Sequence, residues 1–205
     1  YTGAQLEHLG DKRVGIIGTG ATSVQVVPQL ARAAKEVYVF QRTPSSVGVR
    51  NNSFTDPEWW KTLEPGWQAE RQASFTSVVS GEHPEKDLVG DEWSKIWGTD
   101  TQSEPATPEQ PAALEQHDFE VMETLRARID DVIDDPETAE KLKPWYGKHC
   151  KRVTFHDEYL EAFNEPNVHL VDTDGRGVQE VNAKGPVVDG TQYELDMLIY
   201  ASGFE

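Results

Sequence analysis

The stretch VGIIGTGATSVQVVPQL, residues 14–30, decides the fold of this chain. Its first four residues are apolar and predict a buried strand, and Gly18 and Gly20 then predict a tight turn. Apolar residues at helical spacing follow over about residues 21–34, and EVYVFQ at residues 36–41 predicts a second strand. A strand, a glycine turn, a helix and a strand in this order predict an α/β, Rossmann-like dinucleotide-binding domain.

The glycine turn is a Gly-x-Gly-x-x-Ser variant of the dinucleotide fingerprint. The first glycine permits the tight turn, the second lets the bare backbone approach a pyrophosphate, and the third position needs only a small residue. The pyrophosphate would then lie at a helix N-terminus, where free N–H groups and the helix dipole favour negative charge. The candidate cofactor-binding residues of this segment are Gly18, Thr19, Gly20, Ala21, Thr22, Ser23 and Gln25.

The end of the second predicted strand distinguishes NADP from NAD. An NAD site usually has Asp or Glu about 20 residues after the glycines, which accepts a hydrogen bond from the ribose 2′-hydroxyl. This chain instead has Phe40-Gln41-Arg42-Thr43. The Arg42 guanidinium suits a 2′-phosphate, and Thr43 adds a hydroxyl donor, so the sequence predicts NADP(H) as the cofactor.

The rest of the chain divides into a helical block and a second set of strands. Residues 55–148 have mostly helical spacing, with a loop rich in Pro, Thr and Gln at residues 98–113. Strand patterns return at VHLVD, GVQEVNAK and DMLIYASGF. We therefore expect one α/β domain with its core at residues 12–50 and 150–205. The helical block is its insertion, and we expect the tryptophans of this block to form its core.

Composition limits the partners and the compartment. The 205 residues carry a formal net charge of −17, which argues against nucleic acid and anionic membrane surfaces as partners. No apolar segment approaches the roughly 18 residues that a membrane-spanning helix requires. The single cysteine, Cys150, excludes an internal disulfide and is typical of a reducing compartment. We therefore expect a cytoplasmic protein.

Most other catalytic patterns are absent from the sequence. None of the six tyrosines has a lysine four residues later, which excludes the Tyr-x-x-x-Lys pair of short-chain dehydrogenases. No Gly-x-Ser-x-Gly nucleophile turn occurs, and no histidine cluster has metal-ligand spacing. The exception is the basic segment Lys148-His149-Cys150-Lys151-Arg152, which we expect in a loop. A merely solvated charge run is the alternative for this segment.

Four segments in order resemble the flavin-dependent Baeyer–Villiger monooxygenases: GIIGTGATSVQVVPQL, VYVFQRTP, CKRVTFHDEYLEAFNEPNVHLVD and DMLIYASGF. The resemblance frames nearly the whole chain and implies that residues 1–205 are the NADP-binding domain of such an enzyme. It further implies a reaction in which NADPH reduces FAD and one oxygen atom from O2 is inserted beside a ketone carbonyl. The product would be an ester or a lactone.

The resemblance also implies roles for single residues. Arg152 would be the catalytic residue, lying over the flavin and stabilising negative charge during oxygenation. Lys151 would contact the ribose phosphate of NADP together with Arg42 and Thr43. Ser202, which stands in Ala-Ser-Gly where the family has Ala-Thr-Gly, would lie near both cofactors.

The chain also departs from the family pattern. The FAD fingerprint is missing, as is a Phe-x-Gly-x-x-x-His motif expected before Tyr1, and WYGKH replaces a Tyr-Pro-x-Gly arrangement. We therefore expect an excised domain that is inactive alone. Its expected partners are the FAD-binding domain of the same parent chain and a small ketone. The alternatives are an N- or S-oxygenating flavin monooxygenase and a standalone NADP-binding module without catalysis.

Overall fold

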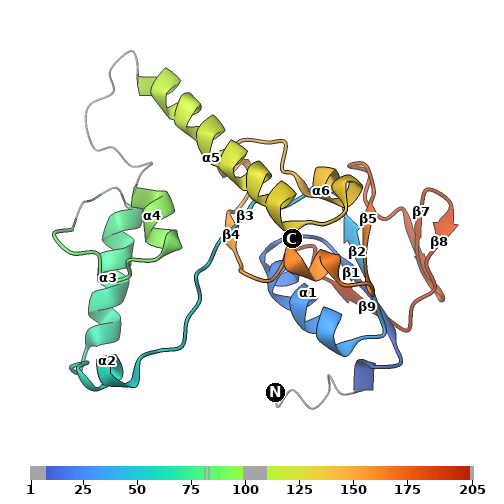
Figure 1. The fold of residues 1–205 in the computed structure, drawn as a ribbon, viewed down its shortest axis with the longest axis horizontal. Helices are drawn as coiled ribbons and strands as arrows, with labels where there is room; N and C mark the ends of the chain where they lie inside the picture. Colours follow the sequence, from blue (N-terminus) through green and yellow to red (C-terminus); the bar gives the residue numbers. More distant parts are fainter. Residues whose placement is uncertain (1–7, 81, 83, 99–109, 204–205) are drawn as a thin grey trace. The chain divides into compact units, whose positions relative to one another are not determined.

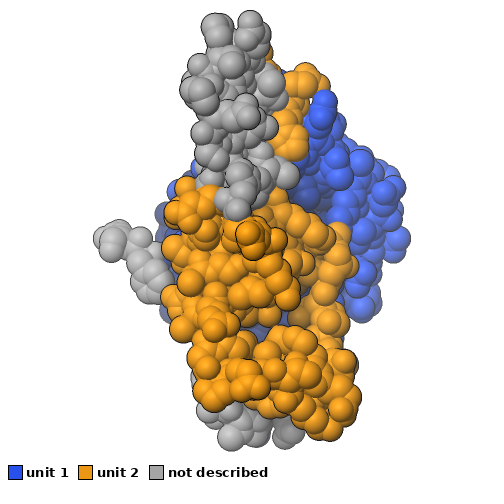
Figure 2. Space-filling model, turned by 90° about the vertical axis from the view of Figure 1, so that its left-hand side faces the viewer, with its two compact units in different colours: residues 1–48, 118–205 blue, residues 49–117 orange. Residues whose placement is uncertain are grey.

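The computed structural model describes residues 8–80, 82, 84–98 and 110–203 (Figure 1). The chain divides into two compact units (Figure 2). The first unit combines residues 1–48 with residues 118–205, and the second unit consists of residues 49–117. The first unit therefore joins segments from both ends of the sequence.

Four parallel strands form the main sheet of the first unit, in the order β5-β2-β1-β9 (Figure 1). They are β1 Arg13–Ile17, β2 Glu36–Gln41, β5 Val168–Asp172 and β9 Met197–Tyr200. Helix α1, Ala21–Ala33, connects β1 to the neighbouring strand β2. The strand order reverses between β1 and β9, as in Rossmann-type sheets, which confirms the predicted α/β class.

Strand β2 shows why the central strands are apolar on both faces. Val37 and Val39 point into the main core, whereas Phe40 packs on the opposite face with Val171 and Val188. Parallel strands that are covered on both sides require continuous apolar runs of this kind. The continuous apolar run VYVF in β2 is therefore explained by the central position of this strand in the sheet.

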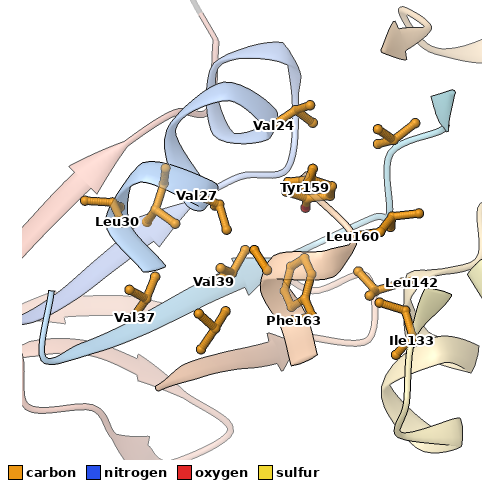
Figure 3. Packing of buried hydrophobic residues seen from close by; sticks show 14 of the residues in the cluster. Val24, Val27, Leu30, Val37, Val39, Ile133, Leu142, Tyr159, Leu160 and Phe163 are labelled. Carbon is orange, nitrogen blue, oxygen red and sulfur yellow. The ribbon is translucent and has the colours of Figure 1, made fainter. Parts of the chain in front are cut away.

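The main core includes β2, α1 and the segment that precedes β5 (Figure 3). Helix α1 contributes Val24, Val27 and Leu30, which recur at helical spacing and are buried. Tyr159 and Phe163 pack edge to face, with ring centroids 5.2 Å apart. These contacts fix α1 against the sheet, and thereby fix the glycine turn at its start.

Residues 118–148 belong to the first unit, although the sequence predicts them in the helical insertion. They include most of α5, Gln110–Val132, and all of α6, Pro136–Leu142. Ile133 and Leu142 are buried in the main core, so apolar packing holds this segment there (Figure 3). The second unit is consequently shorter than the expected insertion.

Two small sheets and the 3-10 turns η2 and η3 also belong to the first unit. Strands β3 and β4 pair in parallel, and β6, β7 and β8 form an antiparallel sheet. The bounds of these elements are β3 Val47–Gly48, η2 Lys148–Cys150, β4 Thr154–Phe155, η3 Glu161–Asn164, β6 Glu180–Asn182, β7 Gly185–Val188 and β8 Thr191–Gln192.

The second unit contains α2 Pro57–Lys61, α3 Trp67–Val79 and α4 Glu92–Gly98, which agrees with the helical spacing of this block. Trp59 and Trp60 are 40% and 56% exposed. The expectation of a tryptophan core is therefore wrong for these two residues, because the single turn and a half of α2 buries no side chain.

The loop predicted at residues 98–113 is only partly described. Residues 99–109 lie outside the described residues, and α5 begins at Gln110, so the loop prediction is wrong for its last residues. Pro111 stands in the first turn of α5, where proline is compatible with a helix. Within the described part of the chain, no helix is both long and apolar enough to cross a bilayer.

Candidate functional site

A cleft with a volume of about 670 Å³ lies at the carboxyl ends of β1, β2 and β9. Open parallel sheets bind ligands at this edge, beside the point where the strand order reverses. The predicted site residues that line this cleft are Gly18, Thr19, Gly20, Ala21, Thr22, Arg42, Thr43, Lys151, Arg152 and Ser202.

Gly18 and Gly20 are glycines for different structural reasons. Gly18 has a φ of 108°, and a Cβ there would lie 2.5 Å from the carbonyl oxygen of Ala201. Gly20 has an ordinary φ of −73°, and a Cβ there would meet no heavy atom within 4 Å. Gly18 therefore allows close packing against the end of β9, whereas Gly20 keeps the space beside the helix open.

The N-terminus of α1 has no side-chain cap. Its N-cap residue is Gly20, and no acidic residue stands in the first turn. The backbone N–H groups of that turn and the positive end of the helix dipole are consequently available to an anion. Ala21 and Thr22 of this turn line the cleft.

Thr19 and Ser45 tie the glycine loop to the loop that follows β2. The buried Thr19 hydroxyl donates to the carbonyl oxygen of Thr43 over 2.7 Å. The Ser45 hydroxyl donates in turn to the carbonyl oxygen of Thr19. This reciprocal pair fixes the loop carrying Arg42 beside the glycine loop.

Ser23 and Gln25, which the sequence predicts as cofactor-binding residues, do not line the cleft. Ser23 is fully buried, and its hydroxyl donates to the carbonyl oxygen of Gly18 over 2.6 Å. The Gln25 amide donates to the carbonyl oxygen of Ala21, one turn back in α1. Ser23 therefore closes the glycine turn, and Gln25 bonds within its own helix.

The cleft concentrates positive charge in an acidic chain. Arg42 directly follows β2, and its exposed side chain lines the cleft together with Lys151 and Arg152. Among the described residues that line the cleft there is no Asp or Glu, although the chain carries a net charge of −17. An anionic ligand therefore meets cations at this cleft and no lining carboxylate.

Lys151 lies close to both Tyr146 and Arg42. Its Nζ atom is 5.2 Å from the centre of the Tyr146 ring. Burial, and after it the nearby Arg42 charge, lowers the pKa of Lys151. A phosphate bound near both cations would relieve this repulsion.

Lys148 is buried, so the alternative of a merely solvated charge run is wrong for this residue. It is 1% exposed, and its backbone N–H donates to Oδ1 of Asp118 over 2.8 Å. It begins the 3-10 turn η2 and does not line the cleft. This burial leaves Lys151 and Arg152 as the two cations of the basic segment at the cleft, with Cys150 an exposed free thiol.

Sequence reasoning missed the turn that follows β5. Thr173, Arg176 and Gly177 of this turn line the cleft, and Arg176 pairs with Asp189 over 2.7 Å. A Cβ at Gly177 would lie 3.7 Å from Cδ of Arg42. The available signal was topological, because the turn after a third parallel strand reaches the same edge of the sheet.

The arrangement suits binding of a phosphate-bearing dinucleotide. The glycine loop and the free N-terminus of α1 can bind a pyrophosphate, while Arg42 and Lys151 can bind a further phosphate. In the part of the chain that the structure describes, no three His, Cys, Asp or Glu residues are grouped to hold a metal ion.

Comparison with known proteins gives relatives over the whole chain. No protein-family model matches. A Baeyer-Villiger monooxygenase of Stachybotrys chlorohalonatus is 53% identical over 216 residues, which cover 100% of this chain and 35% of that protein. By sequence, this chain is similar over its whole length to a segment of proteins named Baeyer–Villiger monooxygenases. Neopentalenolactone D synthase of Streptomyces avermitilis is 50% identical over 215 residues, which cover 100% of this chain and 36% of that protein.

Solved structures of monooxygenases share the fold. The polycyclic ketone monooxygenase from Thermothelomyces thermophila has a TM-score of 0.82 and 46% identity, over 97% of this chain and 34% of that one. A complex of OTEMO with FAD and NADP has a TM-score of 0.74 and 30% identity, over 98% and 39% of the two chains. The chain thus spans about a third of the length of the relatives that it matches.

Proposed function

We propose that this chain, residues 1–205, is the NADP(H)-binding domain of an FAD-dependent Baeyer–Villiger monooxygenase. The parent enzyme uses NADPH to reduce FAD and inserts one oxygen atom from O2 next to a ketone carbonyl, which gives an ester or a lactone. The observation that carries this proposal is the cleft that gathers the glycine loop, Arg42 and Lys151 in a chain 53% identical to a Baeyer–Villiger monooxygenase.

The residues of the cleft fit the phosphates of NADP(H). The open space at Gly20 and the uncapped start of α1 accommodate the pyrophosphate. Arg42 offers a planar guanidinium to the 2′-phosphate, Thr43 offers a hydroxyl, and Lys151 offers an ammonium group. Ser23 supports this site from outside the cleft through its hydrogen bond to Gly18, and the Gln25 side chain bonds within α1 beside the glycine loop.

FAD is proposed to lie mainly on another part of the same parent chain. The 205 residues contain one segment that matches the dinucleotide fingerprint, and the cleft at that segment suits NADP(H). When bound, the flavin supplies the redox chemistry that takes electrons from NADPH and passes them to O2. Ser202, which lies in the cleft two residues after β9, is the residue of this chain that we place near both cofactors.

Arg152 is the proposed catalytic residue. Its side chain is exposed on the cleft, next to Lys151, and no Asp or Glu among the described lining residues neutralises it there. A guanidinium held in this position stabilises negative charge that develops on oxygen as the ketone is oxygenated. We therefore assign different roles to the two neighbours: Lys151 binds the cofactor, and Arg152 stabilises charge on the reacting atoms.

The remaining parts of the proposal concern partners and location. The substrate is a small ketone, and the FAD-binding domain of the parent chain is the protein partner. The net charge of −17 supports the absence of nucleic-acid and membrane partners. A single cysteine, Cys150, supports a cytoplasmic location.

Two measurements test the proposal. Titration calorimetry of the 205-residue chain should show tighter binding of NADP⁺ than of NAD⁺, and equal affinities would contradict the cofactor assignment. The full-length protein should then be incubated with NADPH, O2 and a panel of ketones, amines and sulfides, and the products should be identified by mass spectrometry. Esters or lactones from ketones are expected, and oxygenation of amines or sulfides alone would favour the N- or S-oxygenating alternative.

A further inference from the structure

Tyr146 lies between the two segments that bring cations to the cleft. It precedes the turn η2 by two residues, it is 8% exposed, and it does not itself line the cleft. Its hydroxyl contacts the loop after Arg42, and its ring contacts Lys151. One side chain therefore touches both halves of the proposed phosphate site.

The hydroxyl of Tyr146 makes two hydrogen bonds to the loop that follows β2. It donates to the carbonyl oxygen of Pro44 over 2.8 Å and accepts from the backbone N–H of Ser46 over 3.1 Å. Burial raises the pKa of Tyr146, so the hydroxyl keeps its proton and remains a donor. Pro44 is two residues after Arg42, so these bonds hold the backbone that carries the guanidinium.

The ring of Tyr146 holds the ammonium group of Lys151. The distance of 5.2 Å from Nζ to the ring centre is within the range of a cation–π contact. Lysine has four rotatable side-chain bonds, and without a fixed neighbour its ammonium samples many positions. The ring contact restricts the ammonium group of Lys151, whose side chain lines the cleft together with that of Arg42.

We infer that Tyr146 is a positioning residue, which sets Lys151 and the loop of Arg42 for joint contact with the 2′-phosphate of NADP(H). This inference rests on the proposed NADP site. Tyr146 acts through the two cations, because its own atoms do not reach the cleft. Its contribution should therefore appear in the preference for NADP⁺ over NAD⁺ rather than in nucleotide binding as such.

The test measures dissociation constants of both nucleotides by calorimetry, using the 205-residue chain and variants at Tyr146. Tyr146→Phe keeps the ring and removes both hydroxyl contacts, and it should lower the preference for NADP⁺ by about two- to fivefold. Tyr146→Leu removes the ring as well and should lower the preference by roughly three- to tenfold more.

Double variants assign each loss to its partner. In an Arg42→Ala background, Tyr146→Phe should lower the remaining preference by a smaller factor than in the wild type, because the loop then carries the Thr43 hydroxyl but no guanidinium. In a Lys151→Ala background, the difference between Tyr146→Phe and Tyr146→Leu should vanish. Tyr159→Phe is the matched control, since Tyr159 is buried in the main core and does not line the cleft. It should leave the preference unchanged.

The outcomes separate the inference from the function on which it rests. If the wild-type chain shows no preference for NADP⁺, the proposed NADP site itself fails. If the wild type prefers NADP⁺ and Arg42→Ala lowers that preference, but Tyr146→Phe and Tyr146→Leu leave it intact, the positioning role is overturned. Tyr146→Phe is close in shape to the native side chain, so this comparison holds even where Tyr146→Leu does not fold.

Discussion

Arg42 and Lys151 are distant in the sequence but line the same cleft. Burial, and after it the charge of Arg42, lowers the pKa of Lys151. Both side chains line a cleft in which no Asp or Glu appears among the described lining residues. Two cations held near each other without a carboxylate cost free energy in the empty protein and favour binding of an anion. This relationship supports the proposed NADP site.

Replacement of Arg42 by alanine should remove most of the preference for NADP⁺. A charge-assisted bidentate contact is worth about 1.5–3 kcal/mol, which corresponds to roughly ten- to a hundredfold in affinity. NAD⁺ affinity should change little. Arg32→Ala is the matched control, because Arg32 pairs with Glu158 away from the cleft. A titration in which both arginine variants bind NADP⁺ equally well would refute the role of Arg42.

The lowered pKa of Lys151 predicts a pH dependence of NADP⁺ affinity. Lys151 binds the phosphate as an ammonium ion, and its proton is lost at a lower pH than that of an ordinary lysine. Affinity for NADP⁺ should therefore be full near neutral pH, where the 2′-phosphate is also ionised, and fall as the pH rises toward the pKa of free lysine, about 10.4. Affinity for NAD⁺ should stay level over the same range, and Lys151→Ala should abolish the difference in slope. Parallel slopes for both nucleotides would argue against this role.

The two glycines of the loop should respond differently to alanine. Gly18→Ala adds a Cβ at 2.5 Å from the carbonyl oxygen of Ala201 at a positive φ, and it should lower the free energy of unfolding by about 1–3 kcal/mol. Gly20→Ala meets no neighbour, so it should fold with less than about 1 kcal/mol of loss and bind nucleotides more weakly. Urea unfolding and calorimetry of the two variants check this; a stable Gly18→Ala would contradict it.

Replacement of Arg152 by alanine in the full-length protein should separate cofactor binding from oxygenation. NADP⁺ affinity should stay close to normal, whereas ester formation should fall by about a hundredfold or more, as for loss of an oxyanion donor. Lys151→Ala should instead weaken NADPH binding more than it slows oxygenation. Stopped-flow kinetics resolve the two steps. Ester formation at the wild-type rate in Arg152→Ala would return Arg152 to an ordinary surface arginine.

The contact between Arg13 and Asp196 predicts an acid-dependent loss of stability. The Asp196 carboxylate accepts from the side chain and backbone N–H of Arg13, which lowers the pKa of Asp196 from 3.8 to about 2. Its stabilising contribution is therefore complete above pH 3.8 and lost as the pH falls toward 2. Asp196→Asn should lower the urea midpoint of unfolding at pH 7. The difference in midpoint between the variant and the wild type should shrink as the pH falls from 3.8 to about 2. A difference independent of pH would exclude this linkage.

Local sequence was sufficient for the glycine turn and for Arg42, because the strand, turn, helix and second strand that position them are consecutive. It was insufficient for the rest of the cleft. The burial of Lys148 depends on packing of the segment that includes α5, and the turn at Arg176 reaches the cleft through the pairing of β5 with β2. Ser23 matched the fingerprint, yet its hydroxyl bonds backward to Gly18, which a pattern of residue types does not reveal.

The second unit stands in the sequence between β2 and β5, two strands that are neighbours in the sheet. The entropy of closing such a connection grows only with the logarithm of its length, so doubling it costs about 0.6 kcal/mol. Evolution can therefore lengthen or shorten residues 49–117 at little expense to the sheet. The connection from β1 to β2 has no such freedom, because the single helix α1 must span the length of the sheet so that β2 can pair in parallel with β1. Related chains should consequently differ in length within residues 49–117 and keep the interval from β1 to Arg42 constant.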